Sequence, residues 1–432
     1  MNQASRDDDR RRISQDRAHR CLNWLNLSVA AAQTGFGPFF GVYLTRHGWS
    51  QTDIGLSLSV GVIATMASQI PAGALVDAVP NKTGMAAMGL LGIGASALLL
   101  AIWPAWVLVL GAQILHAFAS SVLGPAIATI SLALIGHEAL GERLGHNSRY
   151  ASIGNAAAAA VLGAVGYYAP ERTIFILAAA LTLPGLISLL LMPAHDLAEA
   201  RASDGHAALL PPELRKGRGE GIWSTLLGRS LLIFCVCSAA FYFASAAMLP
   251  VAANRMTQRA GSVANLFVSA AIILPQIIVA LLSPWVGRAT DRSGRRPFLL
   301  LGFAVVPLRG IVLAVTSHPL IVILAQGFDG IAGAVYGVMV PLIAADLSRR
   351  SGRLNLSMGA IGLAIGLGAS SSTTAAGLVA DRFGARIAFI GLTLAGVVAC
   401  AMLVLLMPET APASRRPAAD PPGRRRPPQS AG

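Results

Sequence analysis

Three ionisable residues lie well inside long apolar runs of this 432-residue chain: His116, Arg309 and Asp329. Ionisable side chains within membrane-length apolar sequence are costly and mark functional sites. Arg309 is about six residues from the end of its run, and Asp329 is about nine from the start of the next. At 1.5 Å per residue their depths differ by roughly 5 Å, which an arginine side chain can span. We therefore predict that Arg309 and Asp329 pair across a helical hairpin.

The residues around two of these positions repeat along the chain. Gln113 and His116 are separated by 213 residues from Gln326 and Asp329, respectively. We predict that Asp329 is a coupling site, where a proton or a substrate is exchanged. His116, which titrates near neutral pH unless perturbed, is its predicted counterpart. The predicted substrate or coupling residues are Asp329, His116, Arg309, Gln113, Gln326, Tyr242 and Gln33. Two alternatives stay open: His116 as a hydrogen-bonded packing residue, and Asp329 as a group that only neutralises Arg309.

A short basic turn between two apolar runs is the second candidate site. It reads GRATDRSGRR over residues 287–296, and a weaker copy, GALVDAVPNK, covers residues 73–82, with the glycines and the aspartates 214 residues apart. Glycine lets a neighbouring helix approach closely. The aspartate ends its own helix, where the dipole disfavours it, so it needs Arg292, Arg295 or the N-terminus of another helix. We predict that this turn acts as a latch between two states of the protein. The predicted gating residues are Gly73, Asp77, Gly287, Asp291, Arg292, Gly294 and Arg295. The alternative is a loop that only sets the orientation of the helices in the membrane.

Composition indicates the elements that must hold these residues. The chain is 54% hydrophobic and 12% charged, against about 25% charged residues in a soluble domain. Apolar runs of 18 or more residues are typical of transmembrane helices. About twelve such runs occur, near 21–44, 54–76, 84–103, 105–135, 150–168, 173–192, 226–252, 263–286, 298–315, 320–345, 354–380 and 387–407. We predict an all-α polytopic membrane protein with twelve transmembrane helices in two six-helix repeats.

The net charge of +13 is explained by topology rather than by nucleic-acid binding. Lys and Arg divide 26 to 6 between the two sides of the predicted membrane, with Arg309 inside a span, of 33 in all. An excess of Lys and Arg marks the cytoplasmic side, so we expect both termini there. The four cysteines show no metal-ligand spacing. We expect no metal, no cofactor and no catalytic residues, and therefore no enzyme.

The repeated basic turn and the twelve runs resemble the major facilitator superfamily of transporters. Its signature loop, Gly-x-Leu-Ala-Asp-Arg-x-Gly-Arg-Arg, is matched in residues 287–296 at the Gly, Asp, Arg, Gly and final Arg positions. The copy at 73–82 keeps Gly73, Leu75, Asp77 and Lys82. The resemblance implies two halves that rock around a midplane site. The Arg of span four and the Gly-Pro of span five, found in proton-coupled drug antiporters, are absent.

These observations predict a multi-pass secondary transporter of the inner (plasma) membrane. It would move a small organic solute by alternating access, with export favoured and proton coupling one possibility. An uptake permease of the same fold and a non-transporting membrane sensor or scaffold are the alternatives. The predicted divisions are a disordered N-terminal cytoplasmic tail (1–20), a six-helix bundle (21–192), a cytoplasmic linker (193–225), a second six-helix bundle (226–407) and a disordered cytoplasmic C-terminal tail (408–432). We expect a monomer in the lipid bilayer.

Overall fold

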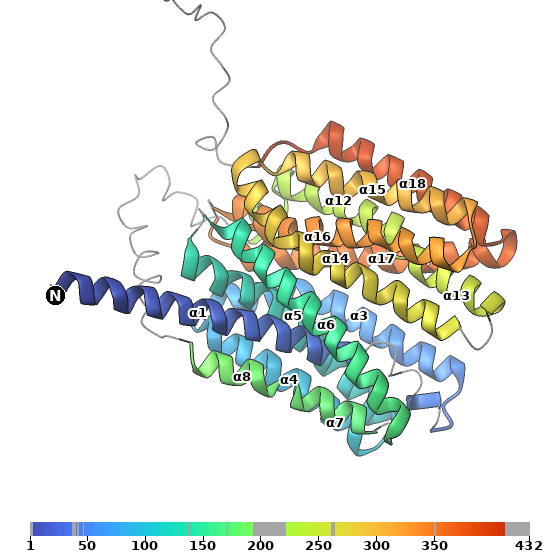
Figure 1. Ribbon diagram of the computed structural model, residues 1–432, viewed down its shortest axis with the longest axis horizontal. Helices are drawn as coiled ribbons and strands as arrows, with labels where there is room; N and C mark the ends of the chain where they lie inside the picture. Colours follow the sequence, from blue (N-terminus) through green and yellow to red (C-terminus); the bar gives the residue numbers. More distant parts are fainter. Residues whose placement is uncertain are drawn as a thin grey trace, which may run out of the picture.

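The structure is a computed structural model that describes residues 3–36, 40, 43–45, 47–136, 139–170, 172–192, 222–260, 264–349 and 351–410. Within these ranges the regular elements are helices, and no strand occurs. Figure 1 shows the helices running lengthwise in two groups that lie side by side, the first half of the chain in blue to green and the second half in yellow-green to red. Most of the predicted linker, over residues 193–221, and of the predicted C-terminal tail, over 411–432, lie outside the described residues.

The first half supplies six crossing segments, of which the last is interrupted. They are α1 (Gln3–Thr34), α3 (Gln51–Ala78), α4 (Lys82–Ile102), α5 (Trp106–Ile135), α6 (Leu140–Tyr168) and the pair α7 (Arg172–Ala180) and α8 (Leu183–Leu190). Asn81 begins α4 by accepting a hydrogen bond from the Gly84 amide (2.9 Å). Such a side-chain cap satisfies a backbone donor that the helix leaves free.

The second half repeats this order after the short helix α11 (Ile222–Leu226). Its segments are α12 (Arg229–Ser245) with α13 (Met248–Ala260), α14 (Ala264–Ser293), α15 (Arg296–Val315), α16 (Pro319–Ser348), α17 (Leu354–Phe383) and α18 (Ala385–Leu406). Gly294 ends α14 with φ +89°, a left-handed conformation that glycine adopts without strain. Glu409 then accepts hydrogen bonds from the Arg295 and Arg296 amides (3.0 Å each) at the start of α15.

Ten stretches of the described helices are long and apolar enough to cross a membrane. They include the predicted spans in α3, α4, α5, α14, α15, α16, α17 and α18, and the joined segments α7–α8 and α12–α13. Helices α1 and α6 occupy the remaining two places in the order, and both carry charged residues at one end. The helix count therefore agrees with the prediction, although α1 and α6 are more polar than the others.

Two helices begin earlier than the spans predicted from the sequence. Residues 3–20, expected to be an unstructured tail, continue α1 without a break. Asp and Arg recur there at four-residue spacing, which supports a helix. The fifth span was placed from Tyr150, but α6 already begins at Leu140. The charges at Glu142, Arg143 and Arg149 lower the hydropathy of this stretch without ending the helix.

Each half has its own apolar core. The first is built from α1, α3, α4, α5 and α8, with residues such as Leu22, Ile93 and Leu123. The second includes Phe303 and also takes Leu144 from α6 of the other half. Across the boundary, α14 packs along α6 and α17 packs along α3. The two halves thus meet through two equivalent helix pairs.

We call the face where α3 ends and α4 begins, and where α14 ends and α15 begins, the signature-loop side. Both basic turns lie there, and so do the beginnings of α6 and α17. The other face, where α4 ends and α5 begins, is called the opposite side.

Candidate functional site

A cavity of about 490 Å³ lies between the two halves. It is lined by α1, α5 and α6 of the first half and by α12, α16 and α17 of the second. Its volume falls within the range of small-molecule sites, about 300–1,000 Å³. The wall is mostly apolar, with a few amides and hydroxyls: Asn26, Gln33, Ser120, Asn147, Ser148, Asn155, Tyr242 and Tyr336. This lining suits an organic molecule with few polar groups.

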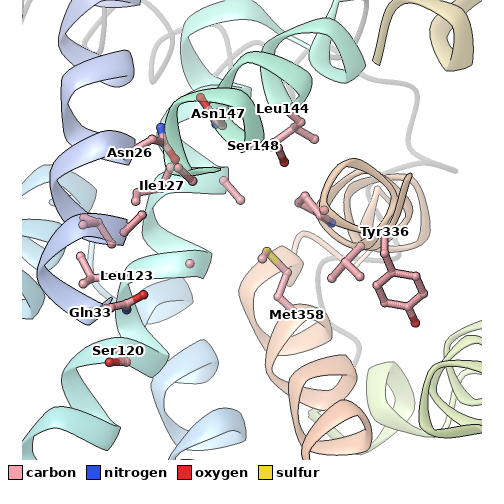
Figure 2. A pocket seen from close by; sticks show the side chains of 18 of the residues that line it. Asn26, Gln33, Ser120, Leu123, Ile127, Leu144, Asn147, Ser148, Tyr336 and Met358 are labelled. Carbon is pink, nitrogen blue, oxygen red and sulfur yellow. The ribbon is translucent and has the colours of Figure 1, made fainter. Parts of the chain in front are cut away.

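The polar side chains of the cavity are concentrated on the first half. Figure 2 shows Asn26 and Asn147 near each other at one end, and Gln33 and Ser120 farther along the same wall. Across the cavity are Tyr336 of α16 and Met358 of α17. Of the predicted substrate or coupling residues, Gln33 and Tyr242 line this cavity.

Arg309, Gln326 and Asp329 form one cluster inside the second half. Arg309 Nη1 donates to Asp329 Oδ1, and Nη2 donates to Gln326 Oε1 (2.5 Å). The Arg309 side chain is 2% exposed, whereas that of Asp329 is 37% exposed. The predicted ion pair between α15 and α16 is therefore present. None of the three residues lines the 490 Å³ cavity, so a coupling site at this cluster would be separate from the cavity wall.

His116 lies close to the cavity without lining it. Its ring stacks on Phe36 of the first span, with centroids 3.8 Å apart. Its Nε2 is 3.3 Å from Ser120 Oγ, and Ser120 lines the cavity. Its Nδ1 is buried without a hydrogen-bond partner among the described residues. Gln113, one turn earlier, is buried beside Gly61 of α3.

Asp77 joins the halves on the signature-loop side. It ends α3, and its carboxylate accepts hydrogen bonds from the Asn355 amide (3.1 Å), the Leu356 amide (2.8 Å) and Asn355 Nδ2 (2.7 Å). These amides are in the first turn of α17, where a helix favours negative charge. Thr129 of α5 also donates to Asn355 Oδ1 (2.8 Å). Asp77 therefore binds the helix N-terminus that the sequence argument required.

Asp291 makes the equivalent contact in the other helix pair. Its Oδ2 accepts from the Glu142 amide in the first turn of α6 (3.0 Å). Its Oδ1 is 3.5 Å from Arg295 Nη1, and Arg295 Nε also reaches Asp346 (3.1 Å). Arg288 adds a cross-half ion pair with Glu142 (3.7 Å). Of the predicted partners, Arg295 and the helix N-terminus hold Asp291.

Gly73 and Gly287 let the helices of each pair touch through their backbones. A methyl group on Gly73 would overlap the Asn355 carbonyl, and one on Gly287 would overlap the Gly141 carbonyl. No side chain fits at either crossing without separating the helices. We call the Gly73–Asp77 contact with α17 the first latch, and the Gly287–Asp291 contact with α6 the second latch.

A buried arginine of the first half was missed from the sequence. Arg143 of α6 is 3% exposed and contacts Asn147, Asn23 and His19. It was counted as a loop residue because the span was started at Tyr150. Its position four residues before Asn147, on one helical face, is the signal that could have revealed it.

Comparison with known proteins agrees with the fold. The family model described as Major Facilitator Superfamily matches residues 22–274 and 260–430. The chain is 32% identical over 402 residues to an uncharacterized MFS-type transporter of Mycobacterium tuberculosis strain H37Rv, covering 91% of this chain and 94% of the relative. It is 37% identical over 95 residues, 22% of each chain, to the class B tetracycline resistance protein of Escherichia coli.

The structure is similar to that of the proton:xylose symporter XylE. The TM-score is 0.73 at 12% identity, covering 92% of this chain and 96% of that one. The arrangement of twelve crossing segments in two six-helix halves is the fold of this group. This chain therefore belongs to the major facilitator superfamily, a family of membrane-spanning transporters.

Proposed function

We propose that this protein is a secondary active transporter that moves a small organic solute by alternating access. The observation that carries the proposal is a cavity between the halves, together with two equivalent latches that join the halves on one side of it. Releasing both latches would let the halves separate on the signature-loop side and open the cavity there. The closed arrangement corresponds to one of the two end states of such a cycle.

We further propose export across the inner membrane, with the signature-loop side facing the cytoplasm. The 26-to-6 division of Lys and Arg supports this orientation and two cytoplasmic termini. The partial similarity to a tetracycline resistance protein supports export. In this proposal residues 21–192 and 226–407 are the two moving bundles, and the chain acts as a monomer.

A test of transport begins with a ligand. Purified protein is screened by thermal shift against metabolites and drugs, because a ligand that binds only the folded state raises the melting temperature. A radiolabelled hit is then followed into proteoliposomes preloaded with the same unlabelled compound. Counterflow into the vesicles supports the proposal. Binding of hits without any exchange across the bilayer would favour a sensor or scaffold instead.

We propose Asp329 as the coupling residue, with His116 as its counterpart on α5. The partial exposure of Asp329 beside a fully buried Arg309 supports a carboxylate that can exchange a proton while its partner stays fixed. The competing explanation is that Asp329 only neutralises Arg309. Asp329→Asn combined with Arg309→Gln separates the two. Recovery of pH-dependent exchange in the double variant would make the pair structural, whereas a folded but uncoupled double variant supports Asp329 as the coupling site.

A further inference from the structure

Three arginines are almost fully buried in the described part of the chain. Arg143, Arg295 and Arg309 are 3%, 2% and 2% exposed. Arg295 is neutralised by Asp346 (3.1 Å) and Asp291 (3.5 Å), and Arg309 by Asp329. Among the side chains that the structure describes, which in α1 begin at Asp16, no carboxylate lies within 4.0 Å of Arg143. It is therefore the one of these three whose charge is left without a counter-ion.

The hydrogen-bond partners of Arg143 are all neutral. Asn147 Oδ1 accepts from Nε (2.9 Å) and from Nη2 (2.7 Å), and Asn23 Oδ1 accepts from Nη2 (2.5 Å). His19 Nδ1 lies 3.1 Å from Nη1. A guanidinium can only donate, so Nδ1 of His19 accepts this bond and the imidazole is neutral. These bonds orient the guanidinium but supply no negative charge.

The acidic residue next to Arg143 in the chain serves another partner. Glu142 is directed to Arg288 of the other half (3.7 Å), and its side chain is 43% exposed. His146, one turn along α6, lies 4.0 Å from the same carboxylate. Arginine stays protonated in proteins, and a buried charge without a partner is strongly unfavourable. An anion from outside the chain would remove this cost.

The unneutralised charge lies next to the cavity. Asn147, whose Oδ1 covers Arg143, lines the cavity, as do Asn26 and Ser148. Figure 2 shows Asn147 and Asn26 together at one end, and the wall beyond them includes the apolar Leu123 and Ile127. Rotation of the Asn147 side chain would free two N–H groups of Arg143 for a ligand that enters this end. One planar carboxylate can accept both, as guanidinium groups favour.

We propose that this end of the cavity binds the carboxylate of an amphiphilic organic anion, with Arg143 as its counter-charge. The apolar wall takes the hydrocarbon part of the same molecule. This inference rests on the proposed function, in which the cavity is the substrate site, and it adds the substrate class. A solute with a single carboxylate and an apolar body matches one buried cation in an otherwise neutral, mostly apolar cavity.

The binding test compares carboxylates with their own amides on the purified full-length protein. The probes are 4-phenylbutyrate, 1-naphthoate and decanoate, each paired with its amide, and acetate serves as a carboxylate without an apolar body. We expect at least one of the larger carboxylates to bind about tenfold or more tightly than its amide, because a hydrogen bond to a charged group is the stronger one. Acetate should give little thermal stabilisation. Equal binding of every acid and amide, or acetate binding as tightly as the larger acids, would overturn the proposal.

Two variants assign the effect to Arg143. Arg143→Gln should remove the preference for the acid over the amide. Asn147→Asp places a carboxylate where Oδ1 already accepts two bonds from Arg143, and Ser131, now 2.8 Å from Asn147 Nδ2, can donate to the new oxygen. This variant should melt at a higher temperature than the wild type and should also lose the preference. A preference that survives in both variants would show that Arg143 is not the counter-charge.

Asn155→Asp is the matched control for stability. Asn155 is on the same helix and lines the same cavity, eight residues beyond Asn147, and its Oδ1 accepts from Thr34 (3.1 Å). A carboxylate there meets no buried cation in its hydrogen bonds, so it should not raise the melting temperature. An equal rise in both Asp variants would contradict the idea of an unneutralised charge at Arg143. Because these tests measure binding and stability, their failure would leave the transport proposal to be decided separately by counterflow.

Discussion

Replacing Gly73 with alanine should open the protein on the signature-loop side. At this position the backbones of α3 and α17 are in direct contact, and a methyl group would overlap the Asn355 carbonyl. A backbone carbonyl in a helix cannot swing aside as a flexible side chain can, so the two helices must move apart. The penalty exists only while the first latch is closed.

The size of the effect follows from the cost of overpacking. An extra methyl group in a tightly packed site costs about 1–3 kcal/mol. The gain in helix propensity from glycine to alanine applies to both the closed and the open state and therefore cancels. A shift of 1–3 kcal/mol corresponds to a change of about 5- to 150-fold in the ratio of open to closed protein. With a starting open share of about 0.1% or less, the open population rises by nearly the same factor and stays in the minority.

Thiol labelling between α14 and α6, one turn before the second latch, measures this change. Ser283 of α14 is fully buried, and its backbone lies against Gly145 of α6. In a protein whose four native cysteines are replaced by serine, Ser283→Cys should react at a rate proportional to the open population. Gly73→Ala should raise this rate by about 5- to 150-fold.

Gly55→Ala is the matched control for this experiment. Gly55 is on the same helix, and a methyl group there meets no other atom within 4 Å. Its labelling rate should stay within about twofold of the parent, as expected for a substitution that touches nothing. Labelling of the Gly73 variant at the parent rate would refute the reasoning, because the close approach would then not hold the closed state.

Further predictions concern the charge of the first latch, the cap of α15 and the orientation of the chain. Asp77→Asn removes the negative charge at the start of α17 and should raise the same labelling rate by about 2- to 30-fold; an unchanged rate would mean that only shape matters there. Glu409→Ala removes the carboxylate that caps α15 and should lower stability by about 0.5–2 kcal/mol, seen as a lower melting temperature, whereas an unchanged melting temperature would dismiss the cap. Cysteines placed in residues 193–224 should resist an impermeant thiol reagent in intact cells and a cysteine near Gly261 should react; the reverse pattern would invert the orientation.

The crossing segments were predictable because hydropathy acts locally. An apolar run of sufficient length must be a helix in a bilayer, since each backbone group needs a partner within its own segment. The start of a helix was predicted too late where charged residues lie inside the helix. Glu142 and Arg143 end the apolar run of the fifth span, yet α6 begins before them because its first turn binds Asp291 and packs against α14.

The latches could be predicted in kind but not in detail. An aspartate at the end of its own helix requires a positive partner, and the sequence offers arginines or another helix N-terminus. Which N-terminus it meets depends on how the halves pack, and that information is not local. The burial of Arg143 also depends on packing that is not local. In the sequence a loop arginine and a buried arginine look alike, and only the packing of α1 against α6 distinguishes them.

Interspin distances on both sides of the protein test alternating access most directly. Spin labels at Pro80 and Ser293 report the signature-loop side, and labels at Trp103 and Leu320 report the opposite side, all at solvent- or lipid-exposed positions. Each pair is measured in the parent protein and in a variant with both latch aspartates, Asp77 and Asp291, replaced by asparagine. The account predicts that loss of the latches lengthens the first distance and shortens the second. Two distances that stay unchanged, or that lengthen together, would contradict it.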